Sequence, residues 1–369
     1  MTGSQRIGII HPGEMGISVA ASAQTSGQEV CWASEGRSAQ TRERAAKFGL
    51  QDMQTLARLC ATCPVIVSVC PPDAADAVAR QVLACSFAGL YLDANAVSPQ
   101  RAIDMGQEMT AAGVAFVDGG IIGGPAWTPG ATRLYLSGPR AGEMAACFAG
   151  GPLATEVIGA EAGKASALKM CYAAYTKGTT ALLAAVLAAA ERLGVRDNLY
   201  RQWDGDDADS AKWAEQRVRQ AGAKAWRFVG EMDEISATFR GAGLPGEFHA
   251  AAAEIYRRLA AFGVAQGTTP FVDVLAALRE GDASVPLHLV YLQSGAVLLP
   301  KKQYSQWRDI VAEYGNGVAS LGPWNVEDVV RFFEQDEGLE DSGWPFSRSQ
   351  IMAFVRSDAM VLDSASLRG

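Results

Sequence analysis

A glycine-rich turn near the start of the chain has the residue types that bind an anion. His11, Gly13 and Gly16 follow the apolar run Ile7–Ile10, which we expect to be a buried strand, and a helix is expected to begin at Met15. Free backbone N–H groups and the dipole of a helix N-terminus converge on one point and stabilise a phosphate there. The spacing matches the dinucleotide fingerprint G-x-G-x-x-G, except that histidine replaces the first glycine. A glycine turn without a ligand is the alternative. The residues predicted to contact a dinucleotide at this turn are His11, Pro12, Gly13, Glu14 and Met15.

The end of the second expected strand, Glu29–Ala33, would select the cofactor. In this architecture an acidic residue there accepts from the ribose 2′-hydroxyl of NAD, whereas basic and hydroxyl residues hold the 2′-phosphate of NADP. Arg37 carries a planar fork of donors that suits a phosphate, and Glu35 is the competing acidic signal. We expect NADP. The residues predicted to hold its 2′-phosphate are Ser34, Arg37, Ser38 and Thr41.

Strands and helices alternate through the first part of the chain. The clearest strand is Pro64–Cys70, which is continuously apolar and β-branched, as strands buried on both faces are. Ser98 and Pro99 open a later helix, with Ser98 as a hydroxyl cap. This alternation predicts an α/β fold with a doubly wound parallel sheet of the Rossmann type over residues 1–160. The other expected strands are Gly89–Asp93, Ala115–Val117 and Thr132–Ser137, with a loop at 118–125. Cofactor contacts after the strands are predicted for Cys70, Pro71, Pro72 and Asn95.

The hydrophobic period changes near Glu161. Ala165–Leu193 predicts one long, mostly buried helix, and three further helices make residues 161–262 an all-α domain. These helices are Asp209–Ala221, Lys224–Phe239 and Glu247–Ala261. Residues 263–369 are expected to be a mostly helical extension of unknown role, in which Pro286–Leu299 is open between helix and strand. Helices are expected at Thr268–Leu278, Trp307–Tyr314 and Val326–Glu334, and His288 is expected to be packed rather than catalytic.

Composition narrows the function classes. The chain has 369 residues, of which 49% are hydrophobic and 20% charged, with a formal net charge of −8. The negative charge argues against nucleic-acid binding and anionic membranes. Seven cysteines, an odd number, suit a reducing cytoplasm. Cys60 and Cys63 lack a second pair or a His cluster, so no metal is expected. The apolar run near residues 180–190 is shorter than a membrane span. With nucleic acid and membranes disfavoured, the expected partner is a small-molecule substrate.

A lysine-containing motif gives the chain a family resemblance. The run from Gly159 through Gly163 to Lys169 resembles the glycine-led lysine motif of the β-hydroxyacid dehydrogenases, which include 3-hydroxyisobutyrate and 6-phosphogluconate dehydrogenases. The HPGEMG turn, the Cys-Pro-Pro strand end, the Asp-x-Asn loop and the double-glycine loop match in order. The resemblance covers about residues 5–262, and the helical part is similar to a subgroup with a phosphogluconate-dehydrogenase-like C-terminal domain.

The resemblance implies that Lys169 is the general acid/base. An ammonium there stabilises and then protonates the oxygen of a carbonyl during reduction. Lys164 and Lys177 are the alternatives, and on a regular helix Lys177 lies about 80° round from Lys169.

Two positions depart from the family pattern: Ala173 stands where the family has Asn, and Ile122 where it has Ser. These losses, with the nearby aromatics Trp127, Tyr172, Tyr175 and Trp226, favour a bulkier, more apolar carbonyl or imine. The residues predicted to contact substrate are Ile122, Gly123, Gly124, Tyr172, Ala173 and Trp226.

We therefore expect an NADP-dependent oxidoreductase acting on a partly apolar, hydroxyacid-like substrate. Imine reduction is an alternative, although imine reductases of this superfamily generally lack the lysine. A non-catalytic NADP-binding sensor is the other alternative. The long helix is apolar on several faces, which predicts a homodimer unless residues 263–369 cover it within one chain.

Overall fold

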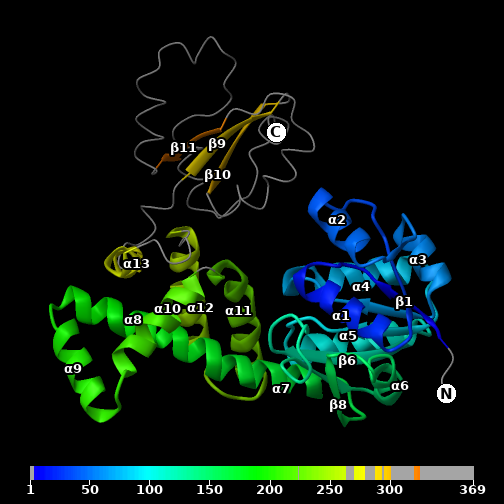
Figure 1. The fold of residues 1–369 in the computed structure, drawn as a ribbon, viewed down its shortest axis with the longest axis horizontal. Coiled ribbons are helices and arrows are strands. Elements are labelled where there is room, and N and C mark those ends of the chain that lie inside the picture. The colour runs from blue at the N-terminus through cyan, green and yellow to red at the C-terminus, as the bar shows by residue number, and fades with distance from the viewer. Residues whose placement is uncertain are drawn as a thin grey trace. The chain divides into compact units, whose positions relative to one another are not determined.

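The computed structural model describes residues 4–222, 224–262, 270–278, 287–292, 295–300 and 320–324 (Figure 1). The chain divides into two compact units. The first contains Met1–Thr179 and Arg227–Ala253, and the second contains Thr180–Trp226 and Glu254–Gly369. The predicted domain limits at residues 160 and 262 remain a prediction.

An eight-stranded sheet forms the centre of the first unit, in the order β3-β2-β1-β4-β5-β6-β7-β8. The first six strands in this order are parallel, β7 runs antiparallel to β6, and β8 is parallel to β7. This order confirms the predicted doubly wound sheet. The strands are β1 Arg6–Ile9, β2 Glu29–Trp32, β3 Gln51–Asp52, β4 Val65–Ser68, β5 Leu90–Asp93, β6 Ala115–Ile122, β7 Arg133–Ser137 and β8 Ala154–Gly159.

Helices cover both faces of this sheet. Apolar side chains of α1, α2 and α6 form one buried cluster with it, and those of α3, α4 and α5 form another. Because helices bury both faces, strands such as β4 are apolar at every position but the last. The helices are α1 Glu14–Thr25, α2 Ala39–Lys47, α3 Leu56–Thr62, η1 Pro72–Ala74, α4 Ala75–Ala84, α5 Pro99–Ala111 and α6 Ala141–Ala146.

Strand β6 differs from its prediction. The expected strand ended at Val117 and a glycine loop followed, but β6 continues through both glycines to Ile122 and pairs with β5 and β7. Glycine is needed within this strand because the helix that contains Ala165 approaches it closely. A Cβ at Gly120 would lie 2.6 Å from the carbonyl oxygen of Ala165. Gly120 therefore lets a helix pack onto the strand. Two strands that lack a clear apolar period, β3 and β8, were not predicted at all.

The long helix is confirmed as one continuous element over Lys164–Arg192. It consists of α7 Lys164–Ala173, the π-helical segment η2 Ala174–Gly178 and α8 Thr179–Arg192. Among the described residues it has the length and mean hydropathy of a membrane span, but half of its most apolar window is buried inside the protein, as in a core helix.

The second unit contains helices and a small sheet. In its described part, α10 carries Arg219 over the ring of Phe271 in α13, 4.8 Å from the ring centre. Helix α9 was not predicted, and α11 and α12 each run through both units. The helices after the long helix are α9 Arg196–Asp206, α10 Ser210–Gly222, α11 Ala225–Gly241, α12 Glu247–Phe262 and α13 Phe271–Ala277.

The ambiguous run at 286–299 is mostly strand. β9 Leu287–Leu292, β10 Gly295–Pro300 and β11 Ser320–Trp324 form an antiparallel sheet in the order β10-β9-β11. The helices expected at Trp307–Tyr314 and Val326–Glu334 lie outside the described residues, and so does the side chain of His288.

Candidate active site

The turn between β1 and α1 leaves open space in front of a helix N-terminus. Gly13 is the residue before α1, and a Cβ built on it meets no atom within 4 Å. A Cβ on Gly16 would lie only 2.0 Å from the carbonyl oxygen of His11, so only glycine fits there. The helix begins at Glu14, one residue earlier than expected. Its first N–H groups lack partners within the helix, so this turn fits a pyrophosphate.

Two nitrogen atoms near this turn are buried without a partner. His11 Nδ1 and Arg37 Nε have no hydrogen-bond partner among the described residues. Burial and then the charge of Arg37 lower the pKa of His11 to about 4, so His11 is neutral at pH 7. Buried donors are normally satisfied by protein, water or ligand. Arg37 Nε can only donate, so it fits a dinucleotide that brings acceptor oxygens to this edge of the sheet, whereas the neutral His11 nitrogen donates or accepts according to its tautomer.

The start of α2 carries the residues predicted to select NADP. Ser38 caps α2, and its Oγ accepts a hydrogen bond from the N–H of Thr41 at 3.3 Å and lies 3.1 Å from Thr41 Oγ1. A single bond between these hydroxyls uses one hydrogen, which leaves the other for a ligand. The N–H of Arg37 donates to the carbonyl of Ser34 at 3.1 Å. The competing Glu35 is exposed.

Asn95 fixes the loop that follows β4. Its Oδ1 accepts from the N–H of Cys70 at 2.6 Å, and its Nδ2 donates to Ser68 and Asp93. The side chain is buried, so its amide groups are engaged within the protein. Burial and the nearby Asp118 raise the pKa of Asp93 to about 7. Asn95 thus positions the loop that begins at Cys70.

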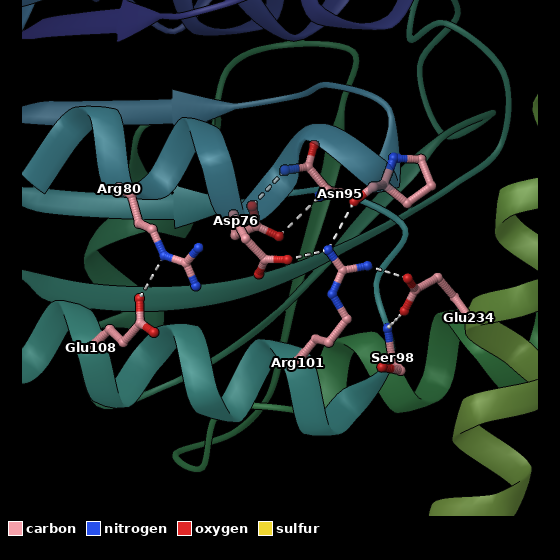
Figure 2. A network of polar contacts seen from close by, with 9 residues as sticks. Asp76, Arg80, Asn95, Ser98, Arg101, Glu108 and Glu234 are labelled. Carbon is pink, nitrogen blue, oxygen red and sulfur yellow. Dashed lines mark hydrogen bonds and ion pairs between the residues drawn. The ribbon is translucent and has the colours of Figure 1, made fainter. Parts of the chain in front are cut away.

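An arginine on α5 holds the same loop from the other side (Figure 2). Arg101 donates to the carbonyl of Pro72 at 3.0 Å and forms ion pairs with Asp76 and Glu234. Glu234, on α11, also accepts from the N–H of Ser98 at 2.7 Å. The expected hydroxyl cap was wrong, because the Ser98 side chain makes no cap hydrogen bond. Pro71 precedes this anchored segment and is exposed.

Asp118 anchors the N-terminus of α7. It is fully buried on β6 and accepts from the N–H groups of Gly163 (2.9 Å) and Ser166 (3.1 Å) and from the hydroxyls of Ser137 and Ser166. These bonds satisfy N–H groups that a helix leaves free at its start. They also fix the rotation of α7 and therefore the position of Lys169, one turn later.

Lys169 projects from α7 over the end of β6. Its Nζ donates to the carbonyl oxygen of Ile121 at 2.8 Å, and its Cβ lies against Gly120, where an added Cβ would be 3.1 Å away. Burial and then the charge of Arg227 lower its pKa to about 8. An amine with this pKa exchanges protons near neutral pH, as a general acid/base must.

The two alternative lysines, Lys164 and Lys177, differ in their exposure and in their nearness to Lys169. Lys164 is exposed and pairs with Glu161 at 3.0 Å, so it does not share the surroundings of Lys169. Lys177 forms an ion pair with Glu231 and lies 4.8 Å from the ring centre of Phe228, both on α11. Arg227, one turn before Glu231, lies 3.7 Å from Glu14 of the glycine turn. Lys177 therefore belongs to the same region as Lys169, unlike Lys164.

The predicted substrate residues lie in different places. Ile122 ends β6, and Gly123 follows with φ +125°, a conformation that favours glycine. Gly124 is exposed in the same loop. On α7, Tyr172 is half exposed and Ala173 is buried.

Two of the expected aromatics, Trp127 and Trp226, lie in different units of the chain. Trp127 stacks on Phe48 at 5.3 Å and lines a groove of about 700 Å³ along α1 and α2, and its expected place in the substrate wall stays a prediction. Trp226 belongs to the second unit, and its predicted substrate contact stays a prediction.

Sequence reasoning missed Asp118, Arg227 and Glu231. A polar residue such as Asp118, in the middle of what proved to be a strand, was a signal for a buried anchor. Arg227 and Glu231 are four residues apart, which places them on one helix face, but nothing local links that face to Lys169.

The two cysteines of the Cys-x-x-Cys pair are buried thiols. Cys60 and Cys63 are buried, and burial raises the pKa of the Cys60 thiol to about 12. All seven cysteines are free, and the described residues contain no group of His, Cys, Asp and Glu suited to a metal.

Comparisons with known proteins agree with this architecture. Residues 6–146 match the NAD-binding domain of 6-phosphogluconate dehydrogenase, and residues 190–259 match a domain of unknown function. One solved structure, a conserved protein of unknown function reported to resemble 3-hydroxyacid dehydrogenases, is 30% identical, with 69% of this chain and 96% of that chain covered and a TM-score of 0.54.

Two further matches are more limited. The 3-hydroxyisobutyrate dehydrogenase of Mycobacterium tuberculosis shares the fold, at 20% identity over 75% of this chain and 100% of that chain, with a TM-score of 0.56. An uncharacterised 28.5 kDa protein of Methanothermus fervidus is 31% identical over 165 residues. That match covers 45% of this chain and 63% of the curated relative, which is less than two thirds of its length.

Proposed function

We propose an activity from one premise: this chain belongs to the family of NAD(P)-dependent oxidoreductases that share the NAD-binding domain of 6-phosphogluconate dehydrogenase. The proposed reaction is the NADP-dependent reduction of a carbonyl, or oxidation of the matching alcohol, in a small to medium, partly apolar, hydroxyacid-like substrate. The observation that carries the proposal is the placement of Lys169 Nζ, 2.8 Å from the carbonyl oxygen of Ile121 at the carboxyl edge of the sheet.

The chain's own residues would act in three ways. A bound nicotinamide cofactor supplies or accepts the hydride. Lys169 donates a proton to the substrate oxygen in reduction and removes it in oxidation. The Ile121 carbonyl and the anchored start of α7 hold that amine in place. Ile122 and Ala173 stand where the resemblance implies polar residues, and their apolar side chains favour a partly apolar substrate.

The test of this function works whichever carbonyl compound is the substrate. NADPH is added to the protein and its fluorescence enhancement is followed, and the loaded protein is then assayed against a panel of aldehydes and ketones. Turnover supports the proposal. Binding without turnover of any carbonyl supports the NADP sensor instead.

We expect Arg37→Ala to weaken NADPH binding by about ten- to a hundredfold, because one charge-assisted phosphate contact contributes about 1.5–3 kcal/mol. NADH lacks the 2′-phosphate, so its affinity should stay the same. Fluorescence titration of both cofactors measures this. Arg42→Ala is the matched control, since Arg42 is the neighbouring arginine on α2 and donates to the Arg37 carbonyl. Equal affinity of the wild type for both cofactors would contradict the NADP assignment.

We also propose a cytoplasmic homodimer. Leu168, Tyr172 and Tyr175 form an exposed apolar stripe along the long helix, at spacings of four and three residues. Light scattering at low micromolar concentration should give about twice the chain mass of 38.9 kDa. Tyr175→Lys should shift the mass to the monomer, because a charge on the stripe opposes its burial. A wild-type mass of 38.9 kDa would instead indicate that residues 263–369 provide the cover within one chain.

A further inference from the structure

The π-helical segment changes which residues of the long helix face Lys169. In an unbroken α-helix, Lys177 would lie about 80° round from Lys169. Ala174–Gly178 is π-helical, so its hydrogen bonds span five residues and each residue advances less round the axis. Lys177 is thereby turned back toward the face of Lys169. The two charges interact: burial, Lys169 and Arg227 together lower the pKa of Lys177.

Positive charge is concentrated at this face. Lys169, Lys177 and Arg227 approach it from α7, the π segment and α11. Carboxylates that face them include Glu231, paired with Lys177, and Glu14, which is 3.7 Å from Arg227. On α12, His249 packs against Gly178, and burial lowers its pKa, which leaves it neutral at pH 7.

This cluster of buried charges is not expected to stabilise the fold. Only 21% of the Lys177 side chain and 15% of the Glu231 side chain are exposed. A buried ion pair adds little net stability because both ions lose their hydration. Cations gathered in a region of low exposure also repel each other. A bound anion would offset this repulsion, and π segments within helices are frequent at functional sites.

We propose that Lys177, supported by Arg227, binds a carboxylate of the substrate whose carbonyl faces Lys169. This inference rests on the proposed function and names its substrate class. Lys177 would supply the polar contact that Ala173 and Ile122 do not provide. The two lysines are eight residues apart, about 12 Å along the helix axis, with the buried Ala173 between them. The substrate would therefore be an oxo acid with an apolar spacer between its carbonyl and its carboxylate.

The decisive experiment compares one acid with its neutral ester. The NADPH-loaded protein is assayed with 6-oxohexanoate and with methyl 6-oxohexanoate. We expect the wild type to prefer the acid by at least about tenfold in kcat/KM (about 1.4 kcal/mol). Lys177→Met should remove the preference by raising KM for the acid, with kcat and the ester little changed. Lys177→Arg should retain it.

Controls separate anchoring from folding and from cofactor binding. Lys164→Met removes an exposed lysine of the same helix and should behave as wild type. The double variant Lys177→Met, Glu231→Gln avoids an unpaired buried carboxylate and should lose the same preference with a normal thermal melt. Retention of the acid preference in Lys177→Met would overturn the proposal. A weakened NADPH affinity with the acid preference intact would also overturn it, because the anion would then belong to the cofactor.

A binding measurement distinguishes this inference from the proposed function. Hexanoate is titrated into the NADP-loaded protein by calorimetry. If neither aldehyde is reduced but hexanoate binds to the wild type and not to Lys177→Met, the carboxylate site stands and the proposed reaction fails. If the wild type does not bind hexanoate, the carboxylate site is overturned.

Discussion

Lys169→Met is expected to lower turnover by about a hundredfold or more, because the variant cannot transfer a proton to the substrate oxygen. The affinity for NADPH should stay within about twofold, since the effect of a general acid lies in the chemical step rather than in binding. Steady-state kinetics on an active carbonyl substrate and a fluorescence titration of NADPH measure the two quantities. Lys164→Met, on the same helix but exposed, should match the wild type.

The pH dependence of the wild type follows from the same amine. Its pKa is about 8, so the ammonium form predominates below that pH and the neutral amine above it. Carbonyl reduction needs the ammonium, so its kcat/KM, which reports the free enzyme, should fall as the pH rises through about 8. Alcohol oxidation needs the neutral amine and should rise through the same range. The Lys169→Met variant should lose this ionisation from both profiles, and a retained ionisation would assign it to another group.

Gly13→Ala and Gly16→Ala are both expected to lose NADPH binding, but for different reasons. An alanine at 13 meets no protein atom within 4 Å, so the protein should fold normally while the added methyl group occupies the space for the pyrophosphate. We expect at least about a tenfold loss of NADPH affinity with an unchanged melting temperature. An alanine at 16 would place its Cβ 2.0 Å from the His11 carbonyl. That overlap should destabilise the fold by about 1–3 kcal/mol or more and also abolish cofactor binding.

The control for both glycines is Gly142→Ala. Gly142 lies in α6, and a Cβ there meets no atom within 4 Å. Because alanine favours a helix over glycine, the variant should be as stable as the wild type or more stable, by up to about 1 kcal/mol. Thermal melts and NADPH titrations of all three variants complete the test. Normal NADPH binding by Gly13→Ala would rule out this turn as the pyrophosphate site.

Local sequence was enough to predict the sheet and its cofactor edge. Neighbouring residues encode each of these elements. The continuous apolar run marks β4, the glycines after β1 permit its tight turn, and the Ser38 side chain caps the start of α2. The long helix was also predictable, because it has no turn signal over nearly thirty residues. The comparison with known families then confirmed the family resemblance.

Local sequence could not predict the contacts that complete the site. Glycines in a row read as a loop, yet Gly120 lies within β6 because α7 packs onto it. Trp127 was expected in a substrate wall, and only the structure shows that it stacks on Phe48. In both cases the deciding partner is distant in the sequence, and a local pattern carries no information about it.

By itself, then, the sequence determined the Rossmann-type sheet, the glycine turn and the lysine on the long helix, because each depends on residues within one or two turns of one another. Only the tertiary structure decided that Lys177 joins Lys169, because the π segment changes the helix rotation and Glu231 arrives from a helix more than fifty positions later. The pKa and the binding properties of a lysine depend on its burial and on the charged residues around it. Both are set by how the helices pack, which no short stretch of the chain specifies.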